Sequence, residues 1–475
     1  MPRSLKTTLF AVAALIGLLV LVAIALGFFF DANAYKTRLE AAASGVLGME
    51  VRVGGRFGIG LFPDLLVTLE DVQIRNRGTD VASAKEARLG LDILPLLLGK
   101  IRIGKIALDH PRISIEKGED GRFNFEKVET PEGMSPGLNL AKVGFSDGTF
   151  HYLDRQSGTE FELGGCAMAL NRLQLSGGAR ADLMKRLAFA ADIACGAIRT
   201  KYFAASELKF SVTGQNGIFD LKSVTMRAFD GQGTGSIRAD FAGAAPLYSI
   251  RYSLSRFHIE AFLKAHSSQK VMEGAMDFTA NLTMRGKTVH ELRQTMAGQF
   301  SLRGKNLTLN GRDLDQQFAR YESSQNFSLV DVGAYAFIGP LGPLITKGYD
   351  FASIFQGSGG HSQIRTLVSD WKVEHGVAQA RDVALATNEN RVALQGGLDL
   401  VNERFDDVTL ALIDPQGCAK VRQEIHGTFK KPVIEKPSVL KSLTGPVLKL
   451  LKKVENLFPG GECDVFYAGS VAAPQ

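Results

Sequence analysis

The stretch Asp407-Val408-Thr409-Leu410-Ala411-Leu412 decides the fold, because apolar side chains recur at every second position. Successive side chains of a β-strand point to opposite faces of the sheet, so such a segment has one apolar face. The same alternation occurs in RISIE at residues 112–116 and in LTL at residues 307–309. We therefore expect strands with one apolar and one polar face from residue 51 to about residue 413.

Short turns separate the predicted strands. Glycine, asparagine and aspartate gather at residues 214–217, 230–233 and 388–390, and these residue types favour turns. The chain contains 51 glycines and 15 prolines, a ratio that favours a turn-rich sheet over a helical bundle. The pattern predicts a mainly β fold, built as an elongated antiparallel sheet.

An uninterrupted apolar run from Leu9 to Phe30 precedes the strands. About 20 helical residues cross the hydrocarbon core of a bilayer, so we expect a transmembrane helix here. Arg3 and Lys6 precede the run without an acidic residue between them, which favours a cytoplasmic N-terminus and an exported body. A cleaved signal peptide is the alternative, since Ala32-Asn33-Ala34 has the form of a cleavage site, but this run is longer than the usual apolar region of about 7–15 residues.

Three later segments break the strand pattern. Residues 35–46 have apolar side chains at helical spacing and reach Gly45 and Gly48, which are suitable helix stops. Residues 314–357 are strongly apolar and predict a helical insert that either caps one end of the sheet or contacts a membrane. Residues 446–458 have an apolar face and lysines opposite it, which predicts an amphipathic helix at a membrane surface or packed on the sheet.

Composition and these segments together predict the organisation of the chain. Apolar residues make up 45% of the sequence and charged residues 22%, which is typical of a folded protein. We expect a cytoplasmic tip and anchor, an N-terminal helix with a first β repeat, a central β-sheet, the apolar insert, a C-terminal β-sheet and an amphipathic helix with a tail. Their respective boundaries are 1–30, 31–135, 136–313, 314–357, 358–435 and 436–475.

The four cysteines fall into two local pairs. An oxidising compartment would allow one disulfide between Cys166 and Cys195 and another between Cys418 and Cys463. Neither pair has the C-x-x-C spacing of a zinc or redox site. Free buried thiols are the alternative interpretation.

Charge and motifs exclude several classes of function. The net charge is +6, but the lysines and arginines are scattered without interleaved aromatic residues, so we expect no nucleic-acid binding. The sequence has no G-x-S-x-G, H-E-x-x-H, P-loop or dinucleotide motif, and its eight histidines have no metal-site spacing. An acid–base pair such as His258 with His266 is disfavoured against ordinary surface histidines. We predict a protein that is not an enzyme and has no cofactor or metal.

Several segments together resemble a known family. The residues that carry the resemblance lie at 30–36, directly after the apolar run, and at 48–55, 61–63, 69–74, 98–103, 108–113, 120–125, 274–304 and 371–400. With these residues the sequence resembles the AsmA family, anchored proteins of the Gram-negative envelope. No single N-terminal segment is enough to identify the family, but the N-terminal segments together are specific for it.

The resemblance implies a location and a function. Family members have a single-pass anchor in the inner membrane, and the bulk of the chain in the periplasm forms a β-groove with an apolar interior. The implied function is to bind phospholipid and to assist its transfer between the inner and outer membranes, which supports outer-membrane biogenesis. The implied partners are phospholipids, the inner membrane and an outer-membrane or envelope protein. A structural or assembly factor for outer-membrane proteins, without enzymatic activity, is the alternative.

The strand pattern itself names candidate lipid-contacting residues. The apolar residues expected to face the groove are Ile101, Ile103, Ile113, Ile115, Phe123, Phe125, Leu307, Leu309, Val392 and Leu394. Arg52 and Arg56, near the membrane-proximal rim, are candidates for head-group contacts. In the alternative interpretation, the same apolar residues form the core of a closed sandwich.

Overall fold

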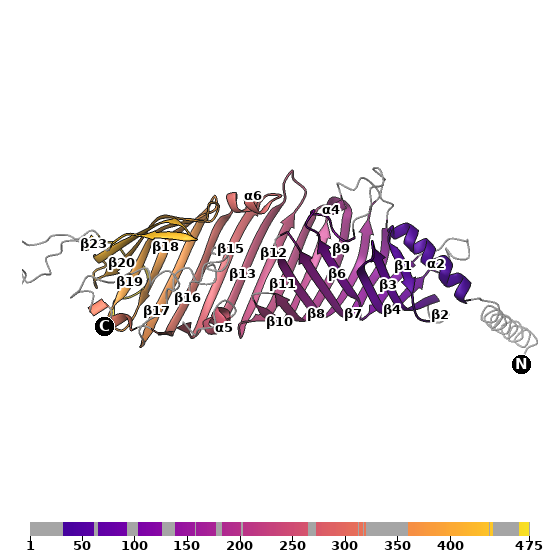
Figure 1. Ribbon diagram of the computed structural model, residues 1–475, viewed down its shortest axis with the longest axis horizontal. Helices are drawn as coiled ribbons and strands as arrows, with labels where there is room; N and C mark the ends of the chain where they lie inside the picture. Colours follow the sequence, from indigo (N-terminus) through magenta and orange to yellow (C-terminus); the bar gives the residue numbers. More distant parts are fainter. Residues whose placement is uncertain are drawn as a thin grey trace, which may run out of the picture. The chain divides into compact units, whose positions relative to one another are not determined.

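The computed structural model confirms a mainly β protein (Figure 1). It describes residues 32–60, 65–92, 103–125, 138–156, 158–176, 183–200, 203–264, 272–311, 313–316, 318–319, 360–436, 438–439 and 465–474. The chain divides into an N-terminal unit, Met1–Pro131 with Leu140–Thr159, and a C-terminal unit, Glu132–Asn139 with Glu160–Gln475. The six-segment division stays a prediction.

The N-terminal unit contains one helix and seven strands among its described residues. They are α2 (Ala32–Leu47), β1 (Glu50–Val53), β2 (Phe57–Gly60), β3 (Leu65–Asn76), β4 (Thr79–Leu91), β5 (Ile103–Asp109), β6 (Arg112–Lys117) and β7 (Leu138–Asp154). Antiparallel pairs join β3 to β1, β2 and β4, and join β4 to β5 and β6. In contrast, β7 runs parallel to β5 and β6, so the expectation of a wholly antiparallel sheet is wrong here. The 20-residue connection from β6 to β7 is long enough for a parallel return, whereas a tight hairpin is not.

Helix α2 confirms the predicted helix at residues 35–46. It ends at Gly48, whose φ is 66° and whose N–H donates to the Ser44 carbonyl at 2.7 Å. Two of its side chains accept hydrogen bonds from β1: Glu40 from Val53 N–H at 2.7 Å and Ser44 from Val51 N–H at 2.9 Å. These bonds hold the helix against the first strand of the sheet.

The predicted anchor and two predicted helices lie outside the described residues. None of the helices described here is both long and apolar enough to cross a membrane, and residues 1–30 are not among those described. Residues 446–458 and most of the insert at 314–357 are also outside the described residues. The described start of the insert is part of the core, since the side chains of Leu314 and Phe318 are buried.

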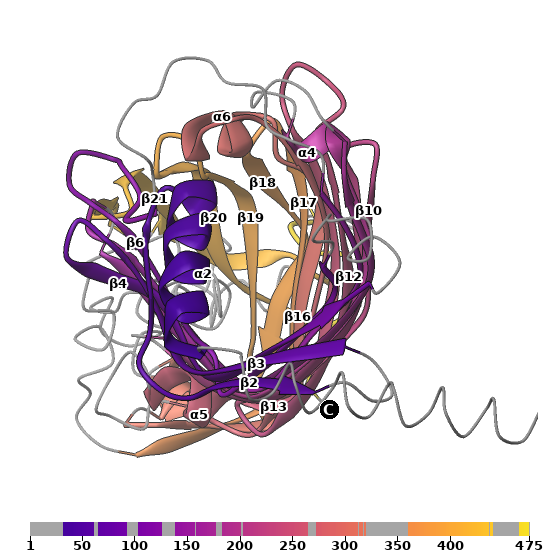
Figure 2. The same ribbon diagram turned by 90° about the vertical axis from the view of Figure 1, so that its right-hand side faces the viewer.

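The C-terminal unit is a curved antiparallel sheet. In order along the chain it contains β8 (Thr159–Leu175), α4 (Leu183–Arg186), β9 (Leu187–Thr200), β10 (Ala204–Gln215), β11 (Ile218–Ala228), β12 (Gly231–Asp240), β13 (Leu247–His258), α5 (Ile259–Lys264), β14 (Met272–Glu273), β15 (Ala275–Arg285), α6 (Val289–Gln294), β16 (Ala297–Asn310), β17 (His361–Glu374), β18 (Val377–Ala386), β19 (Arg391–Asp399), β20 (Arg404–Ile413), β21 (Ala419–Thr428), β22 (Lys431–Ile434) and β23 (Ser438–Val439). The strands pair with their neighbours in the sequence, except that β13 pairs with β15, β14 with β16, and β23 with β21. Figure 2 shows this sheet curving from β10 through β16 to β19 and β20. The antiparallel prediction is confirmed for this unit.

Bulges keep the apolar side chains of these strands on one face. The register shifts next to Glu207, Ser223 and Arg256, whose φ angles are 55°, 51° and 49°. Each is an extra residue in the left-handed region, and such bulges raise the local twist of a strand. The strand therefore resumes its alternation on the same face beyond each bulge.

The turn predicted at residues 230–233 is present but lies earlier in the sequence. The chain turns at Phe229 and Asp230, and Gly231 and Gly233 already belong to β12. These glycines are needed for close packing, because a Cβ atom on Gly233 would lie 2.2 Å from the Tyr252 hydroxyl oxygen. In the sequence, a glycine that forms a turn cannot be distinguished from a glycine that allows close packing within a strand.

A disulfide joins Cys166 of β8 to Cys195 of β9, as the sequence analysis allowed. The two residues are direct cross-strand partners, and both side chains are buried. Cys418 is also disulfide-bonded. Its predicted partner, Cys463, lies outside the described residues.

Removal of the first disulfide should destabilise the protein measurably. We expect the double variant Cys166→Ala with Cys195→Ala to lower the free energy of unfolding by about 2–4 kcal/mol, because the bridge closes a loop of 29 residues. Urea denaturation followed by circular dichroism, compared with the wild type under the same oxidising conditions, measures the change. An unchanged midpoint would show that the bridge adds no stability.

The last ten described residues, Val465–Pro474, form a C-terminal strap on the outer face of β17–β20. Phe466, Tyr467 and Val471 of the strap pack against small apolar side chains of these strands, namely Val368, Ala384, Ala386, Ala393, Ala411 and Ile413. Arg391 of β19 donates to the Val471 carbonyl at 2.9 Å and lies over the Tyr467 ring. This part of the sheet is therefore covered on its outer face.

Candidate functional site

One row of apolar residues, eleven with side chains and one glycine, crosses twelve strands of the C-terminal unit. Each member is the direct cross-strand neighbour of the next, so all of them lie on the same face of the sheet. We call this set the apolar row: Leu170, Ala191, Val212, Leu221, Ile237, Ile250, Leu282, Gly298, Val373, Ala378, Leu398 and Phe405. The face that carries it is the inner face.

Solvent exposure changes along this row. Leu221, Ile237, Ile250 and Leu282, on β11, β12, β13 and β15, are half-buried. From β17 to β20 the residues of the row are buried, with exposed fractions of 1% for Val373, 0% for Ala378, 1% for Leu398 and 5% for Phe405. The inner face over β11–β15, which we call the open face, is thus partly accessible along this row, whereas the inner face over β17–β20, together with the buried side chains of β16, is a closed core.

On the open face, two glycines of β12 lie beside the aromatic ring of Tyr252. Tyr252 lies opposite Gly235 of β12 and Ala280 of β15 in the register, and a Cβ atom on Gly233 would collide with its hydroxyl group. Burial raises the pKa of Tyr252, so the phenol is neutral at physiological pH. Met226 and Phe278, which are partly buried, lie nearby on the same face. The surface offers apolar contacts and one neutral hydroxyl group.

Aromatic rings line both borders of the open face. On one border, Phe219 contacts Phe241 with ring centroids 5.6 Å apart, and Phe241 contacts Tyr248 at 6.0 Å. On the other, Phe229 contacts Phe262 of α5 at 5.2 Å. Aromatic side chains suit such positions because they contribute a large apolar surface at the boundary with water.

The outer face of the same strands is polar. Arg238 of β12 donates to both carboxylate oxygens of Asp220 of β11, each at 3.0 Å. Arg199 of β9 donates to Glu162 of β8 at 2.9 Å. Because the outer face is charged and well solvated, the inner face is the one suited to an apolar ligand.

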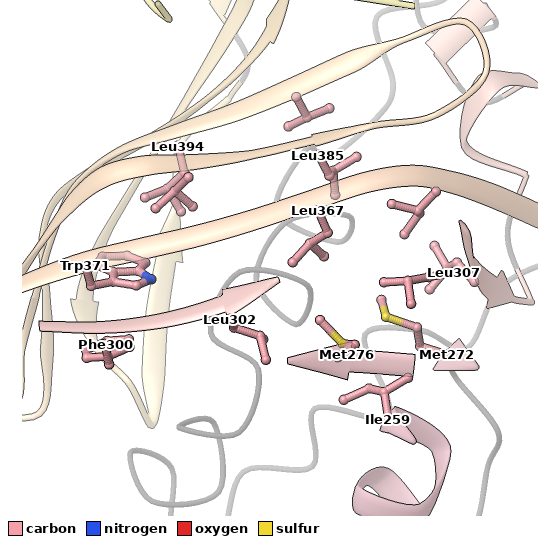
Figure 3. Packing of buried hydrophobic residues seen from close by; sticks show 14 of the residues in the cluster. Ile259, Met272, Met276, Phe300, Leu302, Leu307, Leu367, Trp371, Leu385 and Leu394 are labelled. Atoms are coloured by element: carbon pink, nitrogen blue, oxygen red, sulfur yellow. The ribbon is translucent and has the colours of Figure 1, made fainter. Parts of the chain in front are cut away.

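The closed core contains four of the sequence-predicted lipid contacts. The exposed fractions of Leu307, Leu309, Val392 and Leu394 are 0%, 1%, 0% and 6%. Figure 3 shows Leu394 near Trp371 and Leu307 near Met272 and Met276 among the packed side chains of this core. Protein atoms already surround these four residues.

The other predicted contacts belong to the N-terminal unit. Ile103, Ile113, Ile115 and Phe123 are half-buried, and Phe125 is 40% exposed. In the register Ile113 lies beside Phe150 of β7 and Ile115 beside Tyr152, and the Phe123 and Phe125 rings stack with centroids 5.1 Å apart. Ile101 lies outside the described residues. The role of these residues in lipid binding stays a prediction.

Both proposed head-group arginines have carboxylate partners. Arg52 forms an ion pair with Glu50 at 2.5 Å, and Arg56 forms one with Glu70 at 3.2 Å. The hydrogen bond from the Arg56 side chain lowers the pKa of Glu70 below its usual value. Their charges are therefore partly neutralised within the protein.

The residues of the open face were missed by the sequence analysis. Ile237, Ile250, Tyr252 and Leu282 are absent from the predicted set, although their strands alternate clearly, as LYSIRYSL at residues 247–254 shows. Within the described parts of the chain, no three His, Cys, Asp or Glu side chains are grouped as metal ligands. The half-buried apolar side chains of the open face can hold an apolar chain by burial.

Comparison with known proteins gave one match. A family model described as the AsmA family matches residues 1–132 and 181–335, which is more than half of the chain. Searches of curated proteins and of solved structures each found no match. The matched range contains strands β9 to β16 and therefore the whole open face, whereas the predicted family resemblance at residues 371–400 lies beyond it.

Proposed function

Because the chain belongs to the AsmA family, we propose that its open face binds the acyl chains of phospholipids and assists phospholipid transfer between the inner and outer membranes of a Gram-negative envelope. This activity would support outer-membrane biogenesis. The observation that carries the proposal is the apolar row, which is continuous across the strands and half-exposed from β11 to β15.

The energetics favour movement along the sheet. Burying one CH₂ group contributes about 0.8 kcal/mol, whether the group enters a bilayer or an apolar protein surface. An acyl chain that leaves the bilayer for the open face would therefore exchange one apolar environment for another. Equivalent apolar residues on successive strands would let the chain shift from strand to strand at little cost, without any covalent step.

The proposal includes a location. Residues 9–30 would anchor the chain in the inner membrane, with the bulk of the chain in the periplasm. The apolar run after Arg3 and Lys6 supports this orientation. The Cys166–Cys195 disulfide supports an oxidising compartment for the C-terminal unit.

Two carboxylates on the open face should abolish lipid binding. Ile237 of β12 and Ile250 of β13 are cross-strand neighbours, so the variant Ile237→Asp with Ile250→Asp would place two charges where acyl chains are expected. Native mass spectrometry of the full-length protein in mild detergent, with extraction and identification of bound lipids, measures retention. We expect phospholipid on the wild type and at least a tenfold loss in the variant.

A matched control uses the opposite face of the same strands. Ser236→Asp with Ser249→Asp adds the same two carboxylates on the outer face of β12 and β13, and circular dichroism verifies that both variants fold. Equal lipid retention in the two variants would contradict the proposal. A folded wild type without lipid would favour the alternative function, a structural factor for outer-membrane protein assembly.

A further inference from the structure

Among the described residues, the two borders of the open face carry opposite net charge. Strands β9–β15 end on one side at α4, at the turn between β10 and β11, at the turn between β12 and β13, and at residues 285–291 leading into α6. They end on the other side between β9 and β10, at the turn between β11 and β12, at α5 and at β14. Figure 1 shows α4 and α6 along one border of the C-terminal unit and α5 along the opposite border. We call the first the basic rim and the second the acidic rim.

The described residues of the basic rim include four cations, Lys185, Arg186, Arg285 and Lys287, and two acidic residues, Asp240 and Glu291. Both carboxylates already accept backbone hydrogen bonds, Asp240 from Ala242 N–H at 2.8 Å and Glu291 from Lys287 N–H at 2.7 Å. Arg285 is the last residue of β15 and lies opposite Leu247 on the outer side of the strand, and its guanidinium reaches around to the turn between β12 and β13, where it donates to the Ala245 carbonyl at 3.4 Å. In the described part of the chain, neither Arg285 nor Lys287 forms an ion pair with a carboxylate, and both are exposed.

The acidic rim has the reverse balance. Its described residues include three acidic residues, Asp230, Glu260 and Glu273, and one lysine, Lys264. Glu260 also lies 3.2 Å from His258 and accepts a hydrogen bond from Gly274 N–H at 3.0 Å. An anion at this rim would be repelled, whereas the same anion at the basic rim would be attracted.

A phospholipid that lies on the open face must place its head group at one of these rims. A phosphate group left on the apolar row would be desolvated without a partner, which is costly. Lysine and arginine side chains near a lipid phosphate each contribute about 1 kcal/mol of attraction. Tyr248 and Phe241, at the basic rim, provide the amphipathic border that suits the junction of acyl chain and head group.

We infer that the open face orients a bound anionic phospholipid, with its phosphate at the basic rim and its acyl chains on the apolar row. This inference rests on the proposed function. It assigns to Arg285 and Lys287 a contact with the head group, and it excludes the head group from the rim formed by Asp230 and α5.

Photocrosslinking of the full-length protein in mild detergent tests the orientation. One probe is phosphatidylglycerol with a diazirine on the head group, and the other is phosphatidylglycerol with a diazirine at the end of an acyl chain. We expect the head-group probe to label residues 241–246 and 285–291 at least fivefold more than residues 229–230 and 258–264. The acyl probe should label β11–β15.

The outcomes separate this inference from the proposed function. Acyl labelling of β11–β15 with equal head-group labelling of both rims would overturn the orientation and leave the proposed function standing. No labelling of β11–β15 by either probe would overturn both. Head-group labelling mainly at residues 258–264 would reverse the assignment of the rims and contradict the inference.

Charge reversal provides an independent measurement. The variant Arg285→Glu with Lys287→Glu should reduce the preference for phosphatidylglycerol over phosphatidylcholine about tenfold in competition experiments read by native mass spectrometry. The control Lys222→Glu with Arg251→Glu makes the same change of charge at exposed positions of the outer face and should keep the wild-type preference. An unchanged preference in the rim variant, or an equal loss in the control, would overturn the inference.

Discussion

Replacing Trp371 with alanine should lower the free energy of unfolding by about 3–5 kcal/mol, the usual cost of removing a large buried ring. The side chain is 2% exposed, and its ring stacks on Phe300 of β16 with centroids 6.0 Å apart. Its Nε1–H donates to the Ser369 hydroxyl at 2.7 Å, so the variant would also leave that hydroxyl without its donor. Urea denaturation followed by far-ultraviolet circular dichroism measures the change.

The neighbouring residue provides the control for Trp371. Lys372 is exposed on the other face of the same strand, and Lys372→Ala should change the free energy of unfolding by less than about 0.5 kcal/mol. Trp371→Phe keeps an aromatic ring and should cost less than Trp371→Ala. A loss below about 1 kcal/mol in Trp371→Ala would show that the closed core can collapse around the missing ring.

Replacing Tyr467 with alanine should detach the C-terminal strap, at a cost of about 3–5 kcal/mol for a buried aromatic side chain. The Tyr467 hydroxyl donates to Asp382 of β18 at 2.5 Å and accepts from Val471 N–H at 3.0 Å. Hydrogen exchange should become faster at residues 466–471 and on β17–β20, whose outer face would lose its cover. Val465→Ala, an exposed position in the same strap, is the control, and equal exchange in the two variants would contradict the expectation.

Attachment of the strap should also depend on pH. Burial alone would raise the pKa of Asp382, but hydrogen bonds from Ser470 and Tyr467 outweigh it and lower this pKa. A depressed carboxyl pKa contributes stability above the ordinary value of about 3.9, and this contribution is lost as the pH falls below it. Burial and the bond to Asp382 raise the pKa of Tyr467, so its contribution is present below about pH 10 and is lost at higher pH.

Hydrogen exchange at several pH values tests both signs. After division by the intrinsic exchange rate at each pH, we expect full protection of the strap between about pH 4 and pH 10 and weaker protection on either side, because one of the two groups then changes its charge. Tyr467→Phe should lose the alkaline transition and keep the acidic one. An alkaline transition that persists in this variant would assign it to another group.

Local patterns were enough to predict much of the fold. The alternation at residues 407–412 correctly identified a strand with an apolar face, since Val408, Leu410 and Leu412 are all buried in the closed core. Helical spacing and Gly48 identified α2, and the cysteine spacing identified the Cys166–Cys195 bridge. Each of these features depends on neighbouring residues or on a short loop, so the sequence contains its signal.

Long-range packing could not be predicted in the same way. The parallel pairing of β7 depends on which strand edge it meets, and no residue of β7 encodes that choice. Alternation shows which side chains share a face, but it does not show what covers the face. Val392 and Ile250 therefore look alike in the sequence, although Val392 is fully buried and Ile250 is half-exposed.

The sequential pairing of strands in the C-terminal unit has a consequence for the order of folding. From β8 to β13, and again from β17 to β21, each strand pairs with the one before it in the sequence, so contacts form over short sequence separations and these parts of the sheet can grow hairpin by hairpin. The strap is the exception, since Arg391 bonds to Val471, 80 residues later in the chain. The outer face of β17–β20 therefore stays uncovered until residues 466–471 reach it, and during that interval a chaperone or a second chain can bind there.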